Sequence, residues 1–234
     1  MKEFNAEILE ITNLDNRHGV VLDHTAFYPS GGGQPADKGV IKGEHGEIHV
    51  VGVRMKKDTV VHFAEEIIGQ LAEGDSVKGV IDWTRRYALM RIHTAAHLIS
   101  EAVRKVVDRP LAIVGSGIDV DRARLDLAYH SSLGPLLLEI ENVANAVVEE
   151  NRPVEIKIMP RREAENYVTQ FHESLKILPP QVQKVRIVEI KDWHACACGG
   201  IHVKATGEIG AINVLRRMSK GKDVERIEFT TKTS

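Results

Sequence analysis

Apolar residues recur every three or four positions from residue 83 to about 107, a stretch without glycine or proline. The recurring residues are Ala88, Ile92, Ala95, Ile99, Val103 and Val106. This spacing places them on one face of a helix, so the pattern predicts a long amphipathic α-helix. A second helix is expected over residues 135–149, because Pro135 suits a first helical turn, and a short one over 162–168.

The first 80 or so residues instead alternate short β-branched runs with glycine and aspartate clusters. The runs predict strands at 6–11, 19–23, 39–41, 48–55, 59–63 and 76–81. Later strands are expected at 112–114, 118–127, 153–159, 185–190, 201–205, 211–215 and 226–230. We therefore predict an α+β fold with a small β-barrel-like domain over 1–82 and an α+β domain over 83–234. The boundary near 82–84 is a change of period rather than a flexible linker.

The composition is that of a globular protein, with 43% hydrophobic and 27% charged residues among 234. A net charge of −2 excludes a strongly basic, histone-like nucleic-acid binder, but local basic patches leave a nucleic-acid partner open. The N-terminus carries acidic residues early and lacks a signal-peptide pattern, and the most apolar window, 133–140, is too short to span a bilayer. We expect a cytoplasmic protein with no membrane partner.

Two distant segments carry residues of the kind that bind metal ions. His93 and His97 are four residues apart on the predicted long helix, so both imidazoles lie on one face. Near the C-terminus, Cys198 is followed by Gly199, Gly200 and, after one more residue, His202. We expect the glycines to adopt positive φ values and to aim both side chains at one point. The two pairs together predict a zinc site with His93, His97, Cys198 and His202 as ligands.

Cys196 and His194 are alternative ligands, although Cys196 is favoured as a small buried hydrophobic residue. Two cysteines this close are unsuited to a structural disulfide framework. Thr94 stands where a metalloprotease of the H-E-x-x-H type has its glutamate, which excludes that class. Four protein ligands are typical of structural zinc and an open position of catalytic zinc, so the spacing leaves the role of the metal open.

Three stretches resemble one protein family. HTAAHL (93–98) and CGGIHV (198–203) resemble the paired zinc motifs of the editing domain shared by alanyl- and threonyl-tRNA synthetases. FYPSGGGQPADKG (27–39) resembles the glycine-rich motif of alanyl-tRNA synthetase, and DWTRR (82–86) and RLDL (124–127) fit the same pattern. With no room for an aminoacylation domain, the chain resembles the longer stand-alone alanyl-tRNA editing proteins of the AlaX family. It departs at Ile201, where family members often have threonine.

The resemblance implies a zinc-dependent hydrolase that cleaves the aminoacyl ester of tRNA(Ala) mischarged with serine or glycine. Such an activity is needed because a pocket shaped for alanine rejects residues of similar size only roughly 10–200-fold. The competing interpretations are an RNA-binding module with a structural zinc ion and a metallohydrolase that acts on another ester or amide.

Further candidates follow from the resemblance. Thr25 is the expected reader of the serine hydroxyl, or else it only ends a strand. Gln34 and His24 are candidates for positioning water or substrate, although Gln34 could equally be a surface turn residue and His24 could only flank the loop. The remaining candidates are substrate contacts, namely the glycine triplet Gly31, Gly32 and Gly33 for the tRNA terminus and the lysines Lys220 and Lys222 for phosphates.

Overall fold

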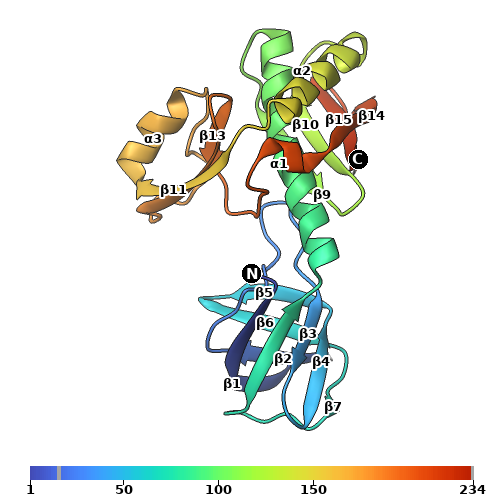
Figure 1. Ribbon diagram of the computed structural model, residues 1–234. Helices are drawn as coiled ribbons and strands as arrows, with labels where there is room; N and C mark the ends of the chain where they lie inside the picture. Colours follow the sequence, from blue (N-terminus) through green and yellow to red (C-terminus); the bar gives the residue numbers. More distant parts are fainter. Residues whose placement is uncertain (15–16, 233–234) are drawn as a thin grey trace. The chain divides into compact units, whose positions relative to one another are not determined.

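A computed structural model describes residues 1–14 and 17–232 of the chain (Figure 1). It divides into two compact units, Met1–Tyr87 and Ala88–Ser234. The division falls within the first helix, α1 (Trp83–Val107). The predicted α+β class is confirmed, because antiparallel sheets occur in both units together with three α-helices among the described residues.

The first unit contains one antiparallel sheet with the strand order β5-β6-β2-β1-β8-β3-β4-β7. Its strands are β1 (Glu3–Leu14), β2 (Arg17–Leu22), β3 (Gly39–Lys42), β4 (Gly46–Val50), β5 (Gly52–Lys56), β6 (Thr59–Ala64), β7 (Ile68–Gly69) and β8 (Ser76–Ile81). Among the described pairings the order has two ends, β5 and β7, so closure into the predicted barrel is not found. The single strand predicted over 48–55 is wrong, because the chain changes partner there: β4 pairs with β3, whereas β5 pairs with β6.

The core of this unit holds the loop that follows β2. Alternate residues of β1, beginning with Phe4, point to one face and are buried. Phe4 lies opposite Gly79 of β8, where a Cβ atom would approach its ring to 2.3 Å, so only glycine leaves room for the ring. The ring of Phe27 meets that of Phe4 edge-on at 5.8 Å between centroids. Phe27 thereby anchors the loop that carries Thr25.

The second unit contains a four-stranded sheet, β14-β15-β10-β9, and a three-stranded sheet, β11-β12-β13, both antiparallel. Its strands and α-helices after α1 are β9 (Ile113–Ile118), β10 (Ala123–Ala128), α2 (Leu137–Glu149), β11 (Val154–Pro160), α3 (Arg161–Thr169), β12 (Lys184–Ile190), β13 (His194–Ala197), β14 (Ala211–Ser219) and β15 (Val224–Lys232). In Figure 1, α1 runs through this unit with the three-stranded sheet on one side and the four-stranded sheet on the other.

Two strand predictions in this unit are wrong. The run 118–127 is broken by a turn, in which the Asp119 N–H donates to the Arg122 carbonyl at 2.8 Å, and it forms parts of two strands, β9 and β10. Residues 201–205 form no strand; only Ala205 makes an isolated bridge. The strand lies earlier instead, at β13, so that the cysteine segment ends a strand and begins a loop.

The predicted long helix is confirmed over Trp83–Val107. Asp82 caps it, because its side chain accepts the Arg85 N–H at 3.0 Å and satisfies one of the free donors of the first turn. The middle of the predicted apolar stripe, Ile92, Ala95, Ile99 and Val103, is fully buried. Within the described part of the chain, no helix is long and apolar enough to cross a membrane.

Candidate metal centre

Helix α1 presents two of the predicted ligands. His93 and His97 lie one turn apart on the same face, with ring centroids 5.3 Å apart. Both side chains are buried in the second unit. The helical spacing therefore places two imidazoles where a single ion could contact both.

The loop after β13 supplies the other two. The Cys198 N–H donates to the Arg186 carbonyl at 3.2 Å, and the Arg186 guanidinium donates back to the Cys198 carbonyl, so Cys198 is held on both sides of its backbone. The predicted positive φ at Gly199 and Gly200 is wrong, since neither is among the described glycines with positive φ. The turn is held differently: the Gly200 N–H donates to Cys198 Sγ at 3.4 Å.

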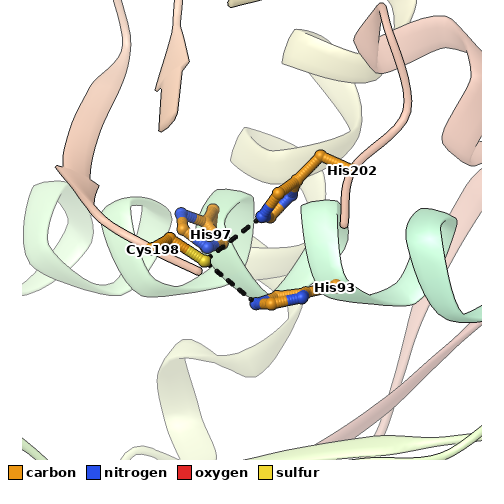
Figure 2. Close-up of side chains that lie close together, drawn as sticks. All are labelled: His93, His97, Cys198 and His202. Carbon is orange, nitrogen blue, oxygen red and sulfur yellow. Dashed lines mark hydrogen bonds between the residues drawn. The ribbon is translucent and has the colours of Figure 1, made fainter. Parts of the chain in front are cut away.

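The four side chains converge although the two segments are about a hundred residues apart in the sequence. Figure 2 shows them meeting from α1 and from the loop. Cys198 Sγ lies 3.6 Å from His93 Nε2 and 3.3 Å from His202 Nε2. One potential ligand atom from each of His93, His97, Cys198 and His202 lies within 4.8 Å of all the others. Three imidazoles and a thiol at this separation could hold one metal ion with tetrahedral geometry.

Burial keeps the imidazoles in the form that binds metal. It lowers the pKa of His93 to about 3 and that of His97 to about 4, and the positive charge of Arg186 acts in the same direction. The rings are therefore neutral at physiological pH and each retains a lone pair. Burial also raises the pKa of Cys198, partly opposed by the Gly200 N–H and Arg186, so metal binding would release the thiol proton.

Thr94 sets the orientation of His202. The Thr94 hydroxyl donates to the Met90 carbonyl at 2.8 Å, so its oxygen accepts from His202 Nδ1 at 3.1 Å and from the Val203 N–H at 3.3 Å. With the proton of His202 on Nδ1, its Nε2 lone pair is directed to the side of Cys198. Outer hydrogen bonds of this kind hold a ligand imidazole in the tautomer that the metal needs.

We expect Thr94→Val to weaken metal binding about 10–100-fold, since it removes the acceptor that holds His202 Nδ1–H but keeps the side-chain volume. Thr94→Ser should retain most of the affinity. Competition with a chromophoric chelator measures this. Equal affinities of the valine variant and the wild type would contradict the role of the hydroxyl.

In the first unit, the Thr25 hydroxyl has two partners. His62 Nδ1 donates to the Val20 carbonyl at 3.0 Å, so its Nε2 accepts the Thr25 hydroxyl proton at 2.8 Å. Thr25 Oγ1 also accepts the Phe27 N–H at 3.1 Å. His62 is fully buried, and burial lowers its pKa to about 4, which keeps it a neutral acceptor. The Thr25 oxygen is left with room to accept one further hydrogen bond but no proton to donate.

The glycine triplet forms a turn in the same unit. Gly31 and Gln34 bridge each other through both backbone groups, at 2.9 and 3.1 Å, and Gly32 and Gly33 have φ of 59° and 81°, values that favour glycine. Gln34 is only 2% exposed, so its interpretation as a surface turn residue is wrong. His24 is exposed and its Nδ1 lies 3.0 Å from the Asp23 carboxylate.

Lys220 and Lys222 lie on the exposed connection between β14 and β15. Within the part of the chain that the structure describes, neither lysine makes an ion pair, whereas the neighbouring arginines are paired with carboxylates: Arg216 with Glu228, Arg217 with Glu225, and Arg226 with Asp126. The two lysines are therefore the cations of this region that remain available to an external anion.

Sequence reasoning missed three residues that the structure places beside the candidates. Thr94 and His62 are polar residues inside buried segments, and Arg186 is a cation within the apolar run of β12. Each is a polar residue in a largely buried segment, which is a usable signal. Their partners, however, come from other segments and are not readable from local sequence.

Two protein-family models match the chain. Residues 1–85 match tRNA synthetases class II (A), and residues 185–228 match the Threonyl and Alanyl tRNA synthetase second additional domain. Among curated proteins, the alanyl-tRNA editing protein AlaX-M of Methanosarcina acetivorans is 37% identical over 236 residues, which cover 98% of this chain and 94% of that protein. The chain belongs to the AlaX-M family. The AlaX-M protein of Methanosarcina barkeri is similar to it to the same degree, 37% over 234 residues.

The family resemblance predicted from the motifs is thus confirmed. The alanine–tRNA ligase of Pyrobaculum neutrophilum is also similar, with 39% identity over 238 residues. That match covers 99% of this chain but 26% of the ligase, so the AlaX-M chain spans about a quarter of the synthetase relative. Of the four clustered side chains, Cys198 and His202 lie within the matched second additional domain, and His93 and His97 precede it.

Proposed function

We propose that this AlaX-M protein is a zinc-dependent aminoacyl-tRNA deacylase that removes serine from mischarged tRNA(Ala), with Gly-tRNA(Ala) as a second substrate. The observation that carries the proposal is the buried convergence of His93, His97, Cys198 and His202 in a chain of the AlaX-M family. Nitrogen and sulfur donors in a tetrahedral set suit Zn²⁺ better than Mg²⁺ or Ca²⁺, which take oxygen ligands.

The residues of the chain have separate roles in this proposal. Thr94 holds His202 in its ligand tautomer, and Arg186 holds the backbone of Cys198. The field of Arg186 reaches the cluster, because it contributes to the lowered pKa of His93, His97 and His202. A positive charge there favours the negative charge that develops on the ester oxygen during attack by water. Zinc, when bound, would polarise the carbonyl or lower the pKa of water.

Selection of serine is assigned to Thr25. Its oxygen has a proton committed to His62 and still accepts one hydrogen bond, so it suits the hydroxyl of serine as a donor. Alanine has no such donor. Gln34, His24 and the glycine triplet remain proposed contacts of the substrate, on the strength of the family resemblance.

We expect Thr25→Val to reduce the ratio of Ser-tRNA(Ala) to Ala-tRNA(Ala) hydrolysis about 5–160-fold, since leaving the bound serine hydroxyl without its partner costs about 1–3 kcal/mol. Deacylation rates of both substrates under single turnover give the ratio. Thr25→Ser restores the oxygen and is the matched control. An unchanged ratio in the valine variant would remove Thr25 from the specificity determinants.

The exposed lysines are assigned to the tRNA backbone. Each phosphate contact contributes a slope of about −0.9 to the dependence of log affinity on log salt. For Lys220→Ala/Lys222→Ala we therefore expect a slope shallower by roughly 1–2, weaker tRNA binding at low salt and no change in the Ser:Gly ratio. Binding titrations at several salt concentrations measure the slope, and a slope equal to that of the wild type would contradict the contact.

One observation favours a second candidate function. Four protein ligands occupy every coordination position of a tetrahedral ion, as in structural zinc sites. A closed site of this kind suits an RNA-binding module without catalysis. The assay that separates the candidates is incubation of purified protein with Ser-tRNA(Ala), with and without a chelator. Zinc-dependent release of serine supports the deacylase. Binding of the tRNA without release of serine supports the RNA-binding module. If the protein neither binds the tRNA nor releases serine, a hydrolase of another ester or amide is the remaining interpretation.

A further inference from the structure

A second group of metal-ligating side chains adjoins the four-residue cluster. His97, His194 and Cys196 each offer one ligand atom, and these atoms lie within 4.8 Å of one another. Strand β13 places His194 and Cys196 two residues apart, hence on the same face of the sheet. Cys196 Sγ lies 3.5 Å from His97 Nδ1, and the rings of His97 and His194 are 5.4 Å apart.

His194 carries an unsatisfied polar atom. The residue is 3% exposed, and among the described residues its Nδ1 has no hydrogen-bond partner. Its other nitrogen, Nε2, lies 4.0 Å from Glu173 Oε1. The two nitrogens of an imidazole point in diverging directions, so Nδ1 is directed away from Glu173. A buried polar atom without a partner costs about 1–3 kcal/mol, a cost that a cation bound through Nδ1 would remove.

His97 belongs to both groups through different atoms. Its Nδ1 lies beside Cys196, which leaves Nε2 as the nitrogen for the ion of the four-residue cluster. A neutral imidazole has one lone pair and one N–H, so it serves one ion at a time. The two groups are therefore alternative positions for a single ion.

We propose that His97, His194 and Cys196 form a second cation position, which binds the same soft divalent ion in alternation with the four-residue cluster. The proposal rests on the metal-binding function proposed for that cluster. When the ion changes position, Cys196 loses its thiol proton, Cys198 takes one up, and the proton of His97 moves from Nδ1 to Nε2, so the charge is unchanged. Three protein ligands leave one coordination position of a tetrahedral ion open, as in catalytic zinc sites, whereas four protein ligands occupy all of its positions.

Cobalt(II) substitution tests this, since a thiolate bound to Co²⁺ gives a sulfur-to-metal charge-transfer absorption band that reports the ligand directly. We expect wild type, Cys196→Ser and Cys198→Ser each to bind one Co²⁺ and to show the band. In the last variant it arises from Cys196. Cys196→Ser/Cys198→Ser and His194→Ala/Cys198→Ser should lose the band. Circular dichroism of each metal-free variant establishes folding.

The outcomes separate the two proposals. A band in Cys196→Ser but not in Cys198→Ser would overturn the second position and leave the first. No band in the wild type would overturn both. If Cys198→Ser does not fold, the His93→Ala/His202→Ala background provides the test, because it leaves two ligands at the first position and three at the second. There, adding Cys196→Ser should abolish the band, and its persistence would overturn the second position.

Discussion

Substitution of His97 by alanine is expected to abolish stoichiometric zinc binding and to lower the rate of Ser-tRNA(Ala) deacylation by more than about 100-fold. Loss of a residue that only hydrogen-bonds to a metal ligand costs up to about 100-fold, and loss of a ligand itself should cost more. His97 is the one residue shared by both groups of potential ligands in the second unit, so no complete set remains without it. Metal analysis and single-turnover deacylation measure the two effects.

His45→Ala is the matched control, because the His45 side chain is 75% exposed and lies far from either ligand group in the sequence. Zinc loading should stabilise the wild type by about 4 kcal/mol at a free zinc concentration of 1,000 times Kd, which corresponds to a rise in Tm of roughly 8–16 °C. His97→Ala should show no such rise. A variant that keeps one zinc ion and the wild-type rate would exclude the proposed centre.

Substitution of Arg86 by methionine is expected to destabilise the first unit by about 3–5 kcal/mol, the cost of leaving a buried carboxylate without its partner. Arg86 is 7% exposed and Asp37 1% exposed. Arg86 Nε donates to both Asp37 oxygens, at 2.8 and 3.0 Å, and its guanidinium also donates to the Ala26 carbonyl at 2.6 Å. Asp37 in turn accepts the Tyr28 N–H at 2.5 Å, so the pair ties both ends of the glycine-rich loop to the start of α1.

Urea denaturation followed by a probe in the first unit measures the loss. The double variant Arg86→Met/Asp37→Asn should recover a large part of it, since it no longer buries an unpaired charge. Lys78→Met is the control, because Lys78 pairs with Glu3 at the surface, where such pairs contribute about 0–1 kcal/mol. Equal stability of Arg86→Met and the wild type would show that the ion pair does not hold the loop.

Local patterns were sufficient where the physics is local. The apolar stripe through Ile92, Ile99 and Val103 has a period that places its residues on one face only in a helix. The structure confirms this helix and the burial of the stripe. The four potential ligands were predictable for a related reason: the His93–His97 spacing belongs to one helical turn, and Cys198 and His202 share one short loop. What joins the pairs in space is the contact of α1 with β13 and the loop after it, from Thr94 to His202 and from His97 to Cys196, which no local pattern encodes.

The failed predictions share a cause, which is competition between local preference and partners elsewhere in the chain. The residue pattern over 48–55 is that of one strand, but the strand is divided at Val51. The Val51 N–H donates to the Phe63 carbonyl at the point where the chain changes its partner strand. The glycines after Cys198 were expected to supply left-handed backbone. The turn is instead held by Arg186 and by the Gly200 N–H, contacts that need the neighbouring strand.

The sequence by itself determined the helix, the β-rich character of the first unit, the family and the residue types available to a metal ion, because these depend on period, spacing and motif. Only the tertiary structure decided which atoms meet: the Thr94 hydroxyl with His202, His62 with Thr25, Asp37 with Arg86, and His97 between two thiols. The physical reason is that hydrogen bonds and ligand sets act over about 3–4 Å, and residues distant in sequence come within that range only when the whole unit is packed.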